Sequence, residues 1–250
     1  MSWEAEFVSV VTFAVPGTPS QSALEVWKKL LPDREPDSFG RPRVPGPPQS
    51  QAMGPFGDYQ LIVVEQGIRT EIRLAGPETP FDEGPSTLKD VVRTVAEAEK
   101  LGASVASAWP MNRLAIQVSL TEEAESTEAA TRLIDEQLPF LQLSQEATDV
   151  LFQLNLRRKS SVEGVALNRL CKWGVAKQQL MSAHFTVGGD GAPHPVLLSE
   201  RDIATYHLDI NTVPRQDAYD GSEVDSLIAE IAEEARTLIG RGYEGLVQNG

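Results

Sequence analysis

The stretch MNRLAIQVSLTEEAESTEAATRLIDEQL, residues 111–138, decides the predicted fold, because a strand followed by a helix begins here for the second time in the chain. Within residues 113–120, large apolar side chains alternate with smaller or polar ones, which is typical of a strand with one buried face. Residues 125–138 predict an amphipathic helix that ends before Pro139 and has an inward face of Ala130, Leu133, Ile134 and Leu138.

The first 110 residues predict the order strand, helix, strand, strand, helix, strand. Ser20 or Ser22 can cap the first helix, and Gln66-Gly67 provides the turn of a hairpin. Gly102 is expected to close the second helix, because glycine is common just past a helix end. The predicted elements are a strand at 5–15, a helix that ends at Pro32, hairpin strands at 59–65 and 68–74, a helix from the capping box of Thr87 and Asp90 to Gly102, and a strand at 103–109.

The same order begins again at residue 111. Residues 148–157 alternate as a strand does, residues 162–171 fit either a hairpin arm or a helix, and residues 172–200 fit no single element. A clear strand at 203–213 and a helix at 222–239 follow. The sequence therefore predicts an α+β fold of two tandem ferredoxin-like (βαββαβ) units, residues 1–110 and 111–250, each with an antiparallel sheet covered by helices on one face.

A Pro/Gly-rich insertion interrupts the first unit at residues 32–58. It holds seven prolines between positions 32 and 55, and it is much longer than an ordinary connection. Two interpretations stay open: a solvated insertion, or a polyproline-like arm that covers a groove or contacts a partner.

Composition restricts the function classes. The net charge of −14 disfavours direct binding of nucleic acid, because phosphate backbones repel an acidic surface. No run of apolar residues reaches the length of a membrane span, and Glu4 and Glu6 stand where a signal peptide would need positive charge, so we expect a cytoplasmic protein. Its single cysteine, Cys171, permits no intramolecular disulfide. The oligomeric state stays open.

The acidity is local. Residues 121–149 and 217–250 carry all but about one unit of the net charge, and both segments contain a predicted helix with almost no lysine to pair with the acids. A solvated face that aids solubility is one interpretation. The other is a surface that binds a basic protein, which would make the chain a non-enzymatic inhibitor, immunity protein or complex subunit. The candidate partner-binding residues are Glu125, Glu128, Asp135, Glu136, Glu230, Glu233 and Glu234.

A second hypothesis, a small-molecule-binding protein or an enzyme, uses a polar face of the second sheet. Period-two alternation places His207 and Asp209 on the face opposite the helices, together with Arg157 if its strand belongs to the same sheet. His207 would act as a base, Asp209 would orient it, and Arg157 would hold an anion. A plainly solvated strand face would show the same pattern.

The sequence patterns around the other reactive residues predict no metal site, no cofactor site and no nucleophile. His194 with Glu200 and Asp202 matches no recognised metal-ligand spacing. Cys171 has no histidine near it in the sequence, which favours a buried structural thiol. The glycine-rich run at 187–195 lacks the lysine of a phosphate-binding loop. The four tryptophans, Trp3, Trp27, Trp109 and Trp173, are predicted to be core or interface anchors.

Overall fold

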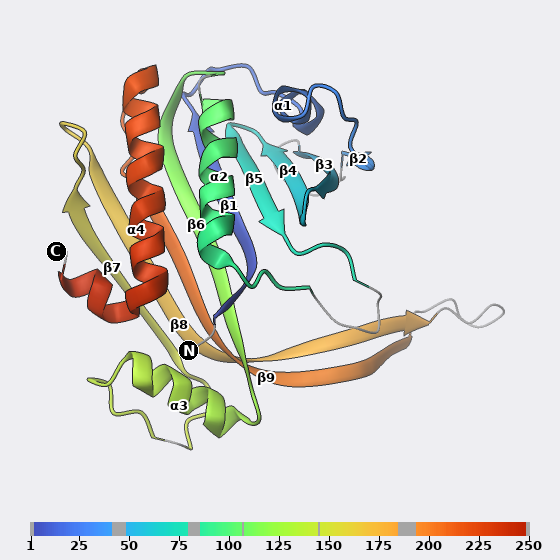
Figure 1. The fold of residues 1–250 in the computed structure, drawn as a ribbon, viewed down its shortest axis with the longest axis vertical. Helices are drawn as coiled ribbons and strands as arrows, with labels where there is room; N and C mark the ends of the chain where they lie inside the picture. The colour runs from blue at the N-terminus through green and yellow to red at the C-terminus, as the bar shows by residue number, and fades with distance from the viewer. Residues whose placement is uncertain are drawn as a thin grey trace.

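The computed structural model describes residues 3–41, 49–79, 86–106, 108–144, 146–184 and 194–248. These residues form nine strands, joined in one sheet of order β2-β3-β4-β5-β1-β6-β9-β8-β7, and four helices (Figure 1). In chain order the elements are β1 (Glu4–Ala14), α1 (Ala23–Leu30), β2 (Ser38–Gly40), β3 (Gln49–Phe56), β4 (Tyr59–Gln66), β5 (Arg69–Ala75), α2 (Val91–Ala106), β6 (Met111–Ala124), α3 (Thr127–Gln137), β7 (Leu151–Lys159), β8 (Ala166–His184), β9 (His194–Thr212) and α4 (Gly221–Gln248).

The prediction of two ferredoxin-like units is wrong. One continuous sheet replaces two, and its neighbouring strands are antiparallel throughout. The error began at Gly102, which does not end the helix: α2 continues to Ala106, so residues 103–106 of the predicted strand are helical. A β-carbon at position 102 would lie 2.9 Å from Val10 Cγ1, so glycine is needed for the close approach of α2 to β1.

Part of the proline-rich segment also differs from its prediction. Residues 49–56 form β3, which pairs with β4 over its whole length, and Ser38–Gly40 form the short strand β2 beside it. The segment therefore extends the sheet and is not simply a solvated insertion. The polyproline-like arm was expected partly at residues 42–48, which lie outside the described residues.

The two halves of the sheet repeat one arrangement. Apart from the short edge strand β2, the first half runs β3-β4-β5-β1 toward the centre and the second runs β7-β8-β9-β6, so β1 and β6 meet as equivalent strands. The helices repeat as well, with α1 after β1 and α3 after β6, then α2 after β5 and α4 after β9. Apart from β2, the repeated order is thus strand, helix, three strands, helix, and the equivalent strands β1 and β6 pair antiparallel at the centre.

Matching caps begin the equivalent helices. Ser22 and Ser126 cap α1 and α3 by accepting the backbone N–H three residues on. Asp90 and Asp220 do the same for α2 and α4, with N–H···Oδ1 distances of 3.0 and 2.8 Å. Short polar residues at equivalent positions therefore fix where each helix starts.

The helices cover one face of the sheet. In Figure 1, α2 and α4 lie side by side in front of the central strands, and Arg236 of α4 pairs with Glu99 of α2 at 2.8 Å. The core between helices and sheet includes the stacked rings of Trp173 and Tyr206, whose centroids are 4.8 Å apart. Helix α3 lies on the same side, because Phe140, just after it, contacts the ring of Tyr243 in α4. Within the described part of the chain, no helix lies on the opposite face. No helix among the described residues is long and apolar enough to cross a membrane.

Candidate functional site

The helix-free face of the sheet, which we call the open face, holds the predicted polar residues. In the register of β6, β9 and β8, His207 lies between Ser119 and Lys172, and Asp209 lies beside Gln117. The predicted alternation along β9 is confirmed, because Tyr206 and Leu208 are buried on the helix side. The helix-free face of β9 and its neighbours therefore faces outward as a polar surface.

Hydrogen bonds connect five polar side chains across four strands of the open face. Arg157 Nε donates to Asn168 Oδ1 at 2.9 Å, and Asn168 Nδ2 donates to Asn211 Oδ1 at 2.9 Å. Asn211 Nδ2 donates to Asp209 Oδ1 at 2.9 Å, and Gln117 Nε2 donates to Asp209 Oδ2 at 3.1 Å. Both carboxylate oxygens of Asp209 thus already accept from amides.

His207 is half-buried and does not form the predicted pair with Asp209. No hydrogen bond joins the two side chains in the described part of the chain, and the acid that acts on His207 is Glu6 of β1. The pKa of His207 is lowered, mainly by burial and also by the Lys172 ammonium, while Glu6 opposes this shift. His207 is therefore favoured in its neutral form, without a carboxylate bonded to its ring.

A depression of about 160 Å³ lies on the open face at His207. Its lining is partly apolar, and the charged or titratable groups on it are Lys172, His207 and Asp209. The remaining lining residues are Phe7, Gln117, Val118, Leu170 and Leu208. Apolar side chains and the Lys172 ammonium therefore both line the depression.

Strand β5 adds an arginine cluster that the sequence reasoning missed. Arg69 and Arg73 each approach a carboxylate oxygen of Glu71 to 2.6 Å, and Ser9 Oγ donates to Glu71 at 3.0 Å. Glu71 is only 3% exposed, and its two arginines lower the pKa of its carboxyl against the opposing effect of burial. The alternation of Arg69, Glu71 and Arg73 within one predicted strand was the signal for this cluster.

Two guanidinium groups on the open face lie over aromatic rings. Arg73 lies 4.3 Å from the centroid of Phe7, and Arg113 lies 4.8 Å from that of Phe13. Nε of Arg113 is buried and has no hydrogen-bond partner among the described residues. Such a donor is available to an acceptor that a ligand would bring.

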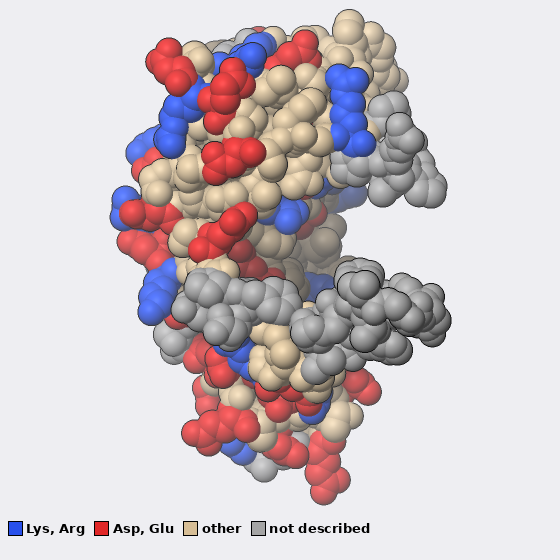
Figure 2. All heavy atoms as spheres, turned by 90° about the vertical axis from the view of Figure 1, so that its right-hand side faces the viewer, with Lys and Arg blue, Asp and Glu red and all other residues tan. Residues whose placement is uncertain are grey.

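We call the surface formed by these cations the basic open face, and it consists of Arg69, Arg73, Arg113, Arg157 and Lys172. The acids that lie among them in the described part of the chain are Glu6, Glu71 and Asp209, and the charge of Glu71 is already neutralised by its neighbours. Figure 2 shows the molecule edge-on, with the side away from the helices on the right. A localised basic surface on the helix-free face therefore exists on a chain of net charge −14.

The charge changes sign toward the start of β1. A second hollow of about 270 Å³ there is lined by Glu4, Glu122 and Glu123, together with Arg201. Glu123 and Arg201 form an ion pair of 3.1 Å. The basic open face therefore ends within the sheet and does not extend over the whole molecule.

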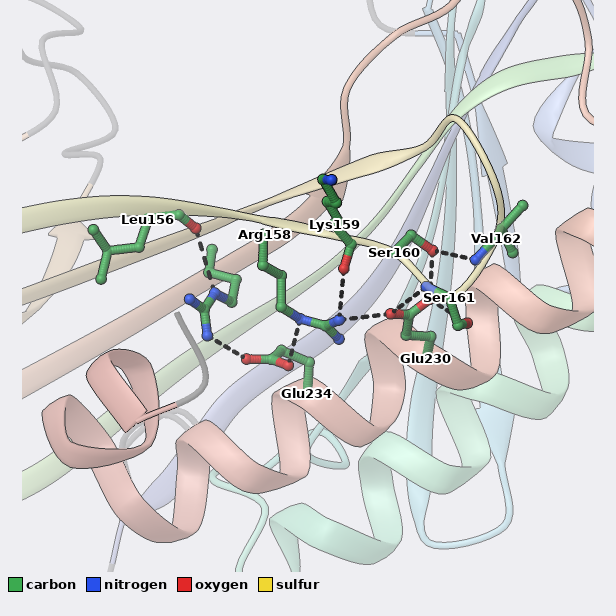
Figure 3. A network of polar contacts seen from close by, with 9 residues as sticks. Leu156, Arg158, Lys159, Ser160, Ser161, Val162, Glu230 and Glu234 are labelled. Atoms are coloured by element: carbon green, nitrogen blue, oxygen red, sulfur yellow. Dashed lines mark hydrogen bonds and ion pairs between the residues drawn. The ribbon is translucent and has the colours of Figure 1, made fainter.

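Two of the predicted partner-binding acids point toward the sheet (Figure 3). Glu234 is 6% exposed and lies between Arg158 Nε at 3.0 Å and Arg169 Nη1 at 3.2 Å. Glu230 accepts from Arg158 Nη1 at 2.7 Å and from Ser160 Oγ at 2.5 Å. These two carboxylates hold α4 against β7 and β8, and they are not free to bind a partner.

The other five predicted acids lie differently. Glu125, Glu128 and Glu136 are exposed on or beside α3, with Arg132 as an exposed cation on the same helix. Asp135 accepts the backbone N–H of Leu143 at 2.8 Å, and exposed Glu233 pairs with Arg236 at 3.0 Å. The acidic surface is therefore centred on α3, and α4 contributes little to it.

The remaining candidates form no site within the described residues. Cys171 is buried, as predicted for a structural thiol, and burial raises its pKa to about 12. Glu200 is held by Lys177 and Gln179. Among the described residues no three His, Cys, Asp or Glu side chains gather where a metal could bind, and most of the glycine-rich run lies outside the described residues.

The chain matches no protein-family model, no curated protein and no solved structure. Its function is therefore inferred from the geometry of its own residues.

Proposed function

We propose that the protein is a binding protein that holds an acidic segment of another polypeptide on the basic open face. The observation that carries the proposal is the concentration of five Lys and Arg side chains on one helix-free face of a strongly acidic chain. Such a charge distribution attracts an anion to one place and repels it elsewhere.

The dimensions favour a polypeptide over a small molecule. The depression of about 160 Å³ at His207 is smaller than the roughly 300 Å³ at which sites for drug-sized ligands begin. It fits one apolar side chain, which Phe7 and Leu170 would contact. The cations extend from β5 to β7, a width of about 24 Å at the spacing of neighbouring strands, and an extended segment of about seven residues covers that distance.

The polar groups support binding better than catalysis. Catalysis by His207 would need a group that orients its ring, and Asp209 is occupied by Gln117 and Asn211. Nucleic acid is a poorer fit than an acidic segment, because its continuous line of phosphates would also meet the acids at the start of β1.

A labelled peptide tests the proposal. The probe has ten residues, mostly Glu and Asp with one central Phe, and fluorescence anisotropy reports its binding. We expect the Kd to rise about tenfold for Lys172→Glu and for Arg157→Glu, and to rise steeply with salt. The matched control is Lys100→Glu on α2, where the lysine is 70% exposed on the helix side.

Three results would contradict the proposal. One is equal binding of a peptide in which every acid is replaced by its amide. Another is equal loss of binding in the Lys100→Glu control. The third is tighter binding of a ten-nucleotide oligothymidine than of the acidic peptide.

A second surface is supported by the exposed acids of α3. Glu125, Glu128 and Glu136 form an acidic patch that fits a basic protein, which is the partner class predicted from the sequence. Charge reversal of these three residues should abolish salt-sensitive binding of a lysine-rich peptide, whereas reversal of the exposed Glu163 should not. Binding that does not depend on salt would remove this surface from consideration.

A further inference from the structure

A polar pocket of about 330 Å³ lies on the other side of the sheet from the basic open face, beside the start of α1. Residues from the turn before α1, from β3 and from β4 form its walls. Its lining consists of Ser20, Gln21, Ser22, Glu25, Arg41, Gln49, Ser50, Glu65 and Gly67. Hydroxyl and amide groups thus surround two carboxylates, those of Glu25 and Glu65.

Glu65 is the unusual group in this pocket. Its side chain comes from β4 on the helix side of the sheet and is 5% exposed. Oε1 is buried and has no hydrogen-bond partner among the described residues, although the Thr70 hydroxyl bonds to the carboxyl group. A buried carboxyl with an unused oxygen is costly unless a ligand completes it.

The charges that face Glu65 make the pocket negative. Glu25 lies on the same pocket and disfavours ionisation of Glu65, and burial together with this repulsion raises the pKa of Glu65 to about 7. Arg41, which also lines the pocket, and Lys29 on α1 act on Glu25, and neither forms an ion pair with Glu65 within the described ranges. A cation entering the pocket would relieve both the burial and the repulsion.

The helix start does not make the pocket an anion site. The backbone N–H of Ala23 donates to Ser50 Oγ at 2.8 Å, and that of Ser22 donates to Glu25 Oε2 at 2.6 Å. The amides that would bind an anion at the start of α1 are therefore already used by the protein's own acceptors.

We propose that this pocket binds a small organic cation, with a primary ammonium group against Glu65 and the body of the molecule among the serine and glutamine side chains. The ammonium pairs with the carboxylate of Glu65 and is also attracted by Glu25. The pocket volume, at the lower end of the range for small-molecule sites, suits a ligand of a few carbon atoms.

Binding is coupled to one proton. The ammonium pairs with the ionised carboxylate, so a protein that starts with Glu65 protonated must release that proton when the ligand binds. Affinity therefore rises with pH below the pKa of Glu65, about tenfold per pH unit at the limit, and levels off above it. An alkylammonium itself stays charged throughout this range.

The test uses n-butylammonium, with n-butanol as its uncharged counterpart. Amide NMR titrations of the full chain at pH 5.5 and pH 8 report the affinity, with the signals of Ser50 and Gly67 as local probes. We expect butylammonium to bind at least tenfold more tightly at pH 8, and butanol to show no shifts at these amides. Glu65→Gln should weaken binding at pH 8 at least tenfold and remove the pH dependence, whereas the exposed control Glu163→Gln should change neither. Arg41→Gln should tighten binding, because it removes a cation from the pocket lining.

Equal affinity at the two pH values, equal shifts with butanol, or unchanged binding by Glu65→Gln would each overturn the proposal. If Glu65→Gln does not fold, the pH dependence of the wild-type protein and the comparison with butanol still decide the outcome.

Discussion

The carboxylate of Glu234 is expected to be one of the larger single contributions to the stability of the fold. It binds Arg158 and Arg169, and the Arg169 side chain is fully buried, with Leu156 O as its other acceptor at 3.3 Å. Glu234→Gln removes the negative charge and leaves the Arg169 guanidinium buried without a counter-ion. Loss of one partner from a buried ion pair costs about 3 to 5 kcal/mol. We expect about 3 kcal/mol here, because the amide oxygen can still accept and Arg158 keeps Glu230.

Urea unfolding followed by circular dichroism measures this cost, and a decrease of about 6 to 12 °C in Tm should accompany it. The matched control is Glu233→Gln, one residue away and 71% exposed, which should cost less than about 0.5 kcal/mol. A double variant, Arg169→Met with Glu234→Leu, should come within about 1 kcal/mol of the wild type, because an apolar pair of similar size needs no counter-ion. A Glu234→Gln variant within about 1 kcal/mol of the wild type would refute the reasoning.

Three further predictions concern buried positions. Gly102→Ala should lower the free energy of unfolding by about 1 to 3 kcal/mol, because the new β-carbon would lie 2.9 Å from Val10. Gly240→Ala places its β-carbon in open space and should raise the free energy of unfolding by up to about 1 kcal/mol. Chemical denaturation of the two variants measures this difference. The wild type should lose up to about 3 kcal/mol of stability relative to Glu65→Gln as the pH rises from about 4.5 to about 7, because its folded state resists ionisation of this buried carboxyl. A difference in unfolding free energy between the two proteins that does not change with pH would contradict this. Cys171 should stay unreactive toward a disulfide reagent at pH 8 in the folded protein and react fully in urea, and rapid labelling of the native chain would exclude its burial.

Local patterns in the sequence predicted individual elements well. The hairpin around Gln66-Gly67 is β4 and β5, and the strand at 113–120 and the helix at 222–239 lie within β6 and α4. These elements are set by alternation, helical periodicity and turn residues close to one another in the chain. The cap of α4 is Asp220, two residues before the predicted helix start, and the helix continues past its predicted end at residue 239 to the non-helical Gly242. Such differences of one or two residues depend on which of several neighbouring polar groups makes the bond.

Long-range pairing could not be obtained from the sequence in the same way. Glycine is needed at position 102 because of the close approach to Val10, more than ninety residues earlier in the chain. The pairing of β1 with β6 joins the two halves into one sheet. Glu234 is buried in an ion pair with Arg169, and the periodicity of α4 alone does not reveal this partner. The side of the sheet taken by His207 was predictable, whereas its true acidic neighbour, Glu6, lies on another strand beside a β-bulge.

The pairing of β1 with β6 at the centre of the sheet has a consequence for how the chain folds. Within each half the hairpin ladders join residues that are close in the sequence, while β1 joins β5 and β6 joins β9 over longer distances, as in Val8 with Leu74 and Val118 with Leu208. The central ladder has the longest separation, about 110 residues, as between Val8 and Val118. We expect the halves to form early and the central ladder to close late, because loops of this length must be ordered before the pairing compensates for them. Until then β1 and β6 are unprotected edges of two half-sheets, each complementary to its counterpart in any other unfinished chain. At high concentration during refolding, the exchange of halves between chains should therefore compete with correct closure.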